Sequence, residues 1–309
     1  MTRVVPADLP RSVKGRLLDI YHARGGDFTL LLTQYGNERL LYRLSVSPYA
    51  ERFVLKGALL FVLWSPRPHR ATRDIDLLGS GDNSSAELMR VFQDVCTVKC
   101  PDDGLEFHPD TVQVSAIGRQ EEYLGQRVQL VTSLGKANIP LQVDVGFGDA
   151  MTLAPELVEY PTLLDFPAPW LRVYARETVV AEKLNAMVTL ELTNSRIKDF
   201  YDLWVMARSF DFDGRTLSSA IRATFARRGT PFAVSPPVAL TTDYSRNQDK
   251  VNLWKAFVRK NQLDVGQVEL EGVVERVCSF LMPVLSALSE GHDLLAKWTA
   301  GGPWVPTRG

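Results

Sequence analysis

Residues 70–78, Arg-Ala-Thr-Arg-Asp-Ile-Asp-Leu-Leu, place the strongest constraint on how this chain folds. The polar start leads into an alternating stretch that predicts a β-strand, whose successive side chains point to opposite faces. Asp74 and Asp76 then share one face, and neighbouring carboxylates repel each other unless a cation lies between them. Mg²⁺ in proteins takes one or two carboxylates together with substrate phosphates, so the pair is a candidate metal clamp. An isolated Asp-x-Asp pair is more often a solvated strand face, so the interpretation depends on other residues.

Length, charge and cysteine usage limit the class of protein. The 309 residues leave room for two domains with sizeable cores. The formal net charge is −1, so any surface that binds nucleic acid must be local. Cys96, Cys100 and Cys278 are too few for a disulfide framework, which fits a reducing cytosol. The N-terminus has no apolar signal core, and no stretch approaches the ~18–20 apolar residues of a membrane span. We therefore expect a cytoplasmic protein with no membrane partner.

A second informative stretch is residues 53–64, Phe-Val-Leu-Lys-Gly-Ala-Leu-Leu-Phe-Val-Leu-Trp. Its apolar start predicts a short buried strand, its end predicts a buried helix, and Lys56-Gly57 forms the junction. A glycine at such a junction lets backbone amides approach a phosphate. Alternatives stay open for both residues. Gly57 either allows a phosphate to approach or is needed only for the tight turn, and Lys56 is either a triphosphate contact or a solvated side chain.

A third carboxylate lies in the apolar strand predicted for residues 140–148. Strand alternation places Asp144 on the face opposite to the aliphatic side chains. A lone carboxylate in such a strand is costly unless it is paired or binds a metal. We therefore expect Asp144 to lie beside Asp74 and Asp76.

The remaining pattern separates strands from helices along the chain. Further strands are predicted at 110–117 and 127–134, and a loop at 118–125. Helices are predicted at 8–24, 27–44, 84–98, 177–192, 197–210, 216–228, 245–261 and 268–289. Residues 155–170 are rich in proline and predict a connection between two lobes, and residues 301–309 predict a frayed tail. Strands followed by a run of helices indicate an α+β fold.

The helical part carries its own charged candidates. Lys183 lies on the predicted helix 177–192, and Asp199 shares a helix face with Asp202 at the i, i+3 spacing. The alternatives are a solvated helix lysine and an acid in the first turn that the helix dipole favours. None of the four histidines has a catalytic partner in the sequence, so a Ser/His/Asp or Cys/His mechanism has no support.

The order of these motifs resembles the AbiEii/AbiGii-type nucleotidyltransferase toxins, a branch of the DNA polymerase β-like nucleotidyltransferase superfamily. The resemblance covers about residues 50–210, and the matching stretches are 53–60, 70–78, 143–145, 182–186 and 196–203. The family usually has a second Gly and a Thr or Ser after Lys-Gly, where this chain has Ala58 and Leu59. A hydroxyl contact to phosphate at that turn is therefore not expected here.

The resemblance implies a two-lobed protein and an activity. Residues 1–168 would form a nucleotidyltransferase domain with a mixed β-sheet and N-terminal helices, and residues 169–309 a helical domain. The enzyme would transfer a nucleoside monophosphate from an NTP, with Mg²⁺ or Mn²⁺ as cofactor, and release pyrophosphate. Members of the family are toxins of type IV toxin–antitoxin systems, paired with a winged-helix antitoxin. Some add nucleotides to the 3′ acceptor end of tRNA, which blocks aminoacylation and translation, so tRNA or another RNA is the expected substrate.

The resemblance also implies roles for the acidic residues and for one lysine. Asp74 and Asp76 would hold Mg²⁺ against the triphosphate, and Asp144 would complete the metal site or help to deprotonate the attacking hydroxyl. Lys183 would reach the triphosphate from the helical lobe, and Asp199 would orient Lys183 or the nucleotide.

Five further positions are expected to bind the nucleotide or the RNA. Lys56 and Gly57 would contact the triphosphate, and Thr72 would bond a phosphate or be self-modified. Arg196 and Lys198 would support the triphosphate or touch RNA phosphate.

Other functions use the same residues. The enzyme alternatives are a nucleotidyltransferase for a small molecule, one that modifies protein hydroxyls including its own, and a kinase-like use of the NTP. A catalytically idle regulatory or antitoxin-like binding protein would be expected to lack some of the acids, and all three are present.

Overall fold

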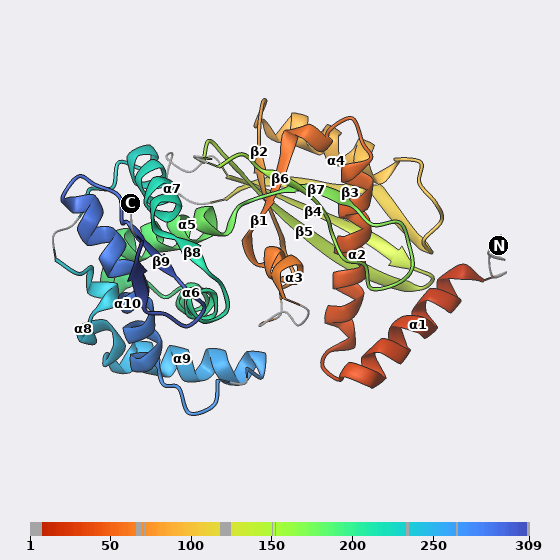
Figure 1. Cartoon of the computed structure of the whole chain (residues 1–309). Helices are drawn as coiled ribbons and strands as arrows, with labels where there is room; N and C mark the ends of the chain where they lie inside the picture. Colours follow the sequence, from red (N-terminus) through yellow and green to blue (C-terminus); the bar gives the residue numbers. More distant parts are fainter. Residues whose placement is uncertain are drawn as a thin grey trace. The chain divides into compact units, whose positions relative to one another are not determined.

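The computed structural model describes residues 8–65, 70, 72–117, 125–149, 151, 153–232, 235–263 and 265–307 (Figure 1). Contacts along the chain divide it into two compact units. The first unit comprises Met1–Gly148 and Pro155–Tyr174, and the second comprises Asp149–Ala154 and Ala175–Gly309. The predicted loop 118–125 lies outside the described residues apart from Gly125, as do residues 66–69.

Two capped helices open the first unit. Helix α1 (Leu9–Arg24) begins after Asp8, whose carboxylate accepts a hydrogen bond from the Arg11 amide at 3.0 Å. Helix α2 (Phe28–Ser45) begins after Asp27, whose carboxylate accepts from the two amides that follow Phe28. Both helices were predicted from the sequence within a residue or two, and most of α2 is buried.

The first unit is built on one mixed sheet with the strand order β3-β4-β5-β2-β1-β7-β6. Pairs β2–β5 and β1–β7 are parallel, and the other neighbours are antiparallel. The strands are β1 (Phe53–Lys56), β2 (Ile75–Gly79), β3 (Leu105–Ile117), β4 (Gly125–Leu134), β5 (Ala137–Phe147), β6 (Glu156–Glu159) and β7 (Trp170–Val173). This sheet confirms the predicted α+β class with a mixed sheet.

Helix α2 packs against one face of this sheet, and α4 (Ser85–Cys96) packs beside it on β3 and β4. Figure 1 shows α2 crossing the strands. A side chain at Gly36 of α2 would meet Leu141 and Ile139 of β5, so these aliphatic residues face the helix. Because side chains alternate along a strand, Asp144 lies on the opposite face.

Two parts of the first unit differ from the sequence prediction. The proline-rich residues 155–170 contain strand β6 and the start of β7, and β7 pairs with β1, so they extend the sheet rather than serve as a bare connection. Strand β2 begins at Ile75, so Asp74 is the residue immediately before the strand.

The second unit is mainly helical. Its helices are α5 (Arg176–Leu190), α6 (Ile197–Ser209), α7 (Gly214–Arg227), α8 (Thr242–Ser245), α9 (Gln248–Asn261) and α10 (Leu270–Ser289). A small sheet of β8 (Phe212–Asp213), β9 (Ala296–Trp298) and β10 (Trp304–Pro306) completes it. The prediction of a frayed tail is therefore wrong for β10, because Trp304 stacks on Phe280 and its indole N–H donates to the Phe280 carbonyl at 2.8 Å.

Helix α10 also corrects an expectation. Its 20 residues are apolar enough to cross a membrane by length and composition, although no such stretch was expected. Half of its apolar window is buried inside the protein, including Val277, Phe280 and Val284, and the helix packs on α6 and α7. These contacts are those of a core helix.

Candidate active site

Four charged residues form one row across the sheet of the first unit. Lys56 on β1 lies opposite Asp76 on β2, Asp76 lies opposite Asp144 on β5, and Asp144 lies opposite Arg127 on β4. Register partners on adjacent strands point to the same face, and the strands lie about 4.8 Å apart. The two carboxylates are therefore direct neighbours, with a basic residue on each side. The placement of Asp144 beside Asp76 agrees with the sequence expectation.

Arg127 was not singled out from the sequence, and it pairs directly with the candidate carboxylate Asp144. Its Nε and Nη2 donate to the two oxygens of Asp144, each at 2.8 Å. This is the bidentate geometry of a strong, charge-assisted pair. The hydrogen bond to Asp144 raises the pKa of Arg127, and the negative charges of Asp74 and Asp76 raise it further. All three carboxylates thus lie within electrostatic reach of one guanidinium.

Gly57 occupies a position that only glycine fits. It follows β1, has a φ of 74°, and begins the short helical turn η2 (Gly57–Leu59) that leads into α3 (Leu60–Trp64). A Cβ at Gly57 would stand 2.7 Å from the Cβ and Cγ of Asp76. The glycine is therefore required by the turn and by the close approach of the Asp76 side chain.

The chain that leads into β2 is fastened to α2 and its cap. The Arg73 guanidinium pairs with Asp27 at 3.1 Å, and the Arg73 carbonyl accepts from Asn37 Nδ2 at 2.7 Å. Asp74 is exposed, and Thr72 is half-buried. On the neighbouring strand, the half-buried Lys56 ammonium lies 5.8 Å from the centre of the Tyr174 ring.

The second unit holds a buried ionic cluster. Lys183 Nζ on α5 donates to Asp199 at 2.7 Å and to Asp202 at 2.8 Å, both on α6. Arg196 Nε adds a second cation to Asp199 at 2.7 Å. Asp199 and Asp202 are fully buried, so they depend on these counter-charges. The expectation that Asp199 orients Lys183 has this contact as its geometric support, whereas Lys198 is exposed.

The candidate carboxylates suit a metal ion whose remaining ligands come from the substrate. No three His, Cys, Asp or Glu side chains of the described ranges stand together as a metal site. Asp74 and Asp76 supply the one or two carboxylates that Mg²⁺ takes alongside phosphate oxygens and water, so they fit this ion. Asp144, the third expected ligand, uses both of its oxygens on Arg127.

A mixed sheet that presents neighbouring carboxylates beside a strand-to-helix glycine defines the class of protein as a nucleotidyltransferase. The chain matches the family model "Nucleotidyl transferase AbiEii toxin, Type IV TA system" over residues 39–273, which is more than half of its length. It therefore belongs to the AbiEii nucleotidyltransferase toxin family, and the resemblance is confirmed. A type IV system implies a cognate antitoxin, and a nucleotidyltransferase implies an NTP substrate.

Solved structures show more distant similarity. A crystal structure from H. pylori, provisionally described as a nucleotidyltransferase, has 15% identity and a TM-score of 0.49, over 84% of this chain and 96% of that chain. JHP933 from Helicobacter pylori has 16% identity and a TM-score of 0.48, over 84% and 93%. An antigenic nucleotidyltransferase-like protein from Paracoccidioides brasiliensis has 13% identity and a TM-score of 0.27, over 82% and 89%. No curated protein matches the chain. The family assignment thus rests on the family model.

Proposed function

We propose that this nucleotidyltransferase transfers a nucleoside monophosphate from an NTP to RNA, most specifically to the 3′ acceptor end of tRNA, and thereby blocks translation. The observation that carries the proposal is the direct pairing of Asp76 with Asp144 in a chain of this toxin family. Two adjacent carboxylates are unfavourable for folding, and they are useful where a cation and a triphosphate must be held together.

Asp74 and Asp76 are the proposed holders of Mg²⁺, which Mn²⁺ would replace. When bound, the ion neutralises charge on the triphosphate. Gly57 leaves space for the Asp76 side chain. Lys56 offers an ammonium to the triphosphate, and the half-buried Thr72 offers a hydroxyl to a phosphate oxygen.

Asp144 is proposed to act next to Asp74 and Asp76 by holding Arg127. Both of its oxygens accept hydrogen bonds from Arg127, so a role as general base would require this pair to open. The pair does hold the Arg127 guanidinium near Asp74 and Asp76. Arg127 thereby adds positive charge where the triphosphate would lie, and phosphoryl transfer depends mainly on positioning and charge neutralisation.

In the second unit, Lys183 is the proposed cation for a phosphate group of the nucleotide. Asp199 and Asp202 fix its ammonium by two short contacts, which lowers the conformational freedom that binding would otherwise remove. Arg196 is half-exposed and Lys198 is exposed, so both are proposed to contact nucleotide or RNA phosphate.

A cytoplasmic location and a winged-helix antitoxin are part of the same proposal. The tRNA acceptor is available in the cytoplasm, and the three cysteines are all free thiols, as in a reducing compartment.

The experiment that tests this function uses the full chain with Mg²⁺, total tRNA and each of four α-³²P NTPs in turn, followed by a denaturing gel. We expect a labelled tRNA band from one NTP, and loss of the band in Asp74→Ala and Asp76→Asn. A labelled protein band instead of tRNA would favour modification of protein hydroxyls. Label in a small hydroxyl compound would favour a small-molecule acceptor. Either result would contradict the RNA assignment.

A further inference from the structure

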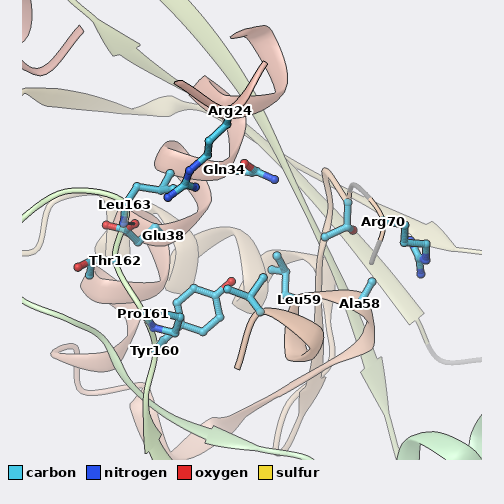
Figure 2. Close-up of a pocket in the computed structure, with 12 residues that line it drawn as sticks. Arg24, Gln34, Glu38, Ala58, Leu59, Arg70, Tyr160, Pro161, Thr162 and Leu163 are labelled. Carbon is cyan, nitrogen blue, oxygen red and sulfur yellow. Dashed lines mark hydrogen bonds between the residues drawn. The ribbon is translucent and has the colours of Figure 1, made fainter. Parts of the chain in front are cut away.

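A cavity of about 400 Å³ lies in the first unit (Figure 2). Ala58 and Leu59, which line it, directly follow Gly57 in the chain. Thr72, also in its wall, lies two residues before Asp74. The cavity therefore adjoins the turn after β1 and the segment that leads into β2.

One part of the cavity wall is apolar. Leu59 and Val62 come from the turn and helix after Gly57, and Leu163 comes from the segment between β6 and β7. The ring of Tyr160 lies in the same wall, as Figure 2 shows. The volume falls within the ~300–1,000 Å³ of small-molecule sites, and apolar side chains are typical of the walls of such sites.

Two polar side chains of the cavity wall, Glu38 and Tyr160, are buried, and Gln34 beside them is half-buried. Glu38 is 3% exposed; its Oε2 accepts from the Leu163 amide at 2.6 Å, and its Oε1 accepts from Arg39 Nη1 at 3.4 Å. Tyr160 is 5% exposed, yet within the described ranges its hydroxyl makes no hydrogen bond, and the same holds for the Gln34 amide. Figure 2 shows Gln34, Glu38 and Tyr160 around the same space. The Tyr160 hydroxyl and the Gln34 amide can therefore form hydrogen bonds with a ligand that enters the cavity.

We propose that this cavity binds a nucleobase that bears an exocyclic amine and discriminates against uracil. The proposal rests on the proposed function, because it places the base of a substrate next to the site that holds its phosphates. Above about pH 7, where Glu38 is ionised, its carboxylate accepts hydrogen bonds, and the amines of adenine, cytosine and guanine donate them. Uracil presents a carbonyl at the corresponding edge, so it would turn an acceptor toward a buried acceptor, which is a strong basis for rejection.

The other side chains complete the recognition of a base. The Tyr160 hydroxyl and the Gln34 amide each donate and accept, so they can pair with ring nitrogens and carbonyls. Leu59 and Val62 cover an aromatic face. Arg24 and Arg70 also line the cavity and bring positive charge for the phosphates that a nucleotide carries.

The base belongs either to the donor NTP or to the terminal nucleotide of the RNA, and binding without transfer distinguishes them. In one arm, the full-length protein is dialysed to equilibrium against labelled ATP, CTP, GTP and UTP. In the other, the ligands are four RNA trinucleotides that differ only in the 3′ base. In one of the two arms, we expect the uracil ligand to bind at least tenfold more weakly than the other three. Discrimination among the NTPs would assign the cavity to the donor nucleotide, and discrimination among the trinucleotides would assign it to the 3′ base of the RNA. Equal binding of all four bases in both arms would overturn the proposal.

Variants then assign the discrimination to this cavity. Glu38→Gln keeps an oxygen for the Leu163 amide and adds an N–H donor, so uracil should gain at least tenfold relative to the amine-bearing bases. Tyr160→Phe removes one hydroxyl and should weaken binding of every accepted base several-fold. Tyr42→Phe also removes one tyrosine hydroxyl. Tyr42 lies on α2 one turn after Glu38 and does not line the cavity, so this variant should bind the bases as wild type does. Thermal unfolding shows whether each variant is folded.

The outcomes for this proposal and for the proposed function are separable. Base discrimination in dialysis with no labelled product would contradict the transfer reaction and leave the cavity assignment in place. Labelled tRNA with equal binding of all bases, or discrimination that Glu38→Gln and Tyr160→Phe leave unchanged, would overturn the cavity assignment alone.

Discussion

Asp76 on β2 and Asp144 on β5 are register partners in adjacent parallel strands, so the sheet holds two carboxylates side by side. Lys56 and Arg127 occupy the next positions of the same row. The bidentate bond from Arg127 neutralises one acid of the pair directly. Such an arrangement costs free energy in the folded chain, and the cost falls at the site where an enzyme of this class needs negative charge.

A first prediction follows for Asp76. Asp76→Asn should abolish nucleotide transfer and leave the free energy of unfolding unchanged or raised by about 0.2–1 kcal/mol, because the amide removes a like-charge contact across the strands. Urea unfolding and the labelled transfer assay measure both effects. Asp110→Asn, at an exposed position of β3 in the same sheet, is the matched control and should be active with a stability change within about 0.5 kcal/mol. An unfolded Asp76→Asn would show that the acid has a structural role instead.

The turn at Gly57 allows a matched pair of glycine substitutions. Gly57 and Gly81 both have positive φ angles, of 74° and 84°, so alanine strains the backbone at each by about 1 kcal/mol. Only at Gly57 would the new Cβ also collide with Asp76; at Gly81 the nearest atom is on the Arg52 side chain at 3.8 Å. Gly57→Ala should therefore abolish transfer and cost more stability than Gly81→Ala, which should stay active. Equal activity of the two variants would remove Gly57 from the site.

The local order of apolar and polar residues was sufficient to predict where Asp144 and Gly57 lie in their elements. The strict alternation around Asp144 placed it on the face of β5 opposite to the aliphatic residues, and the structure pairs it with Asp76 as expected. The junction at Gly57 was also apparent, since an apolar strand, a glycine and an apolar helix follow one another. The sequence did not reveal why a glycine is needed there, because the collision between a Cβ at position 57 and Asp76 depends on the antiparallel pairing of β1 and β2.

The residues that sequence reasoning missed are those set by pairing between distant strands or by burial. Arg127 becomes a partner of Asp144 only through the register of β4 on β5, which a single strand does not reveal. Glu38 and Arg39 interrupt the apolar residues of α2, and this buried charged pair was the available signal for the cavity. The strand at residues 156–159 was missed because prolines around it indicated a loop, and an edge strand tolerates proline nearby.

A double-mutant cycle can measure the bond between Arg127 and Asp144. The Arg127 side chain is 39% exposed, so solvent screening limits the coupling free energy to about 1 kcal/mol despite the bidentate geometry. The cycle combines Arg127→Met with Asp144→Asn and reads each variant by urea unfolding. The pair Arg90–Asp94 on α4 is a more exposed control and should couple more weakly than Arg127–Asp144. No difference between the two cycles would contradict the assigned geometry.

Lys183 should be necessary for folding as well as for activity. Lys183→Met leaves the buried Asp199 without one of its two cations and Asp202 without the Lys183 ammonium, which should cost about 3–5 kcal/mol. Lys198→Met, at an exposed position on α6, should change stability by no more than about 0.5 kcal/mol. Chemical unfolding compares the two. A stable Lys183→Met protein that has lost only transfer would show that the lysine acts on substrate without supporting the fold.

Glu38 predicts a particular dependence of stability on pH. Burial raises the pKa of Glu38 from 4.5 to about 7, and the hydrogen bond from the Leu163 amide and the charge of Arg39 oppose this shift. The negative charge of Asp103 also raises the pKa of Glu38. Tyr160 and Arg24 line the same cavity as the Glu38 carboxyl. Between pH 4.5 and 7 the folded state therefore keeps a proton on Glu38 that the unfolded state has released, so the contribution of Glu38 to wild-type stability falls as the pH rises through this window.

Glu38→Gln removes this proton and its pH dependence. The free energy of unfolding of the variant, relative to wild type, should rise by about 1 kcal/mol per pH unit from roughly pH 5 to 7 and stay constant above roughly pH 8. Urea unfolding at half-unit pH steps gives the difference curve. Glu106→Gln, at an exposed position of β3, has no buried carboxyl to neutralise and should run parallel to wild type. A Glu38→Gln curve that also runs parallel would mean that the Glu38 carboxyl is already ionised at pH 5, and that Arg39 and the Leu163 amide outweigh its burial.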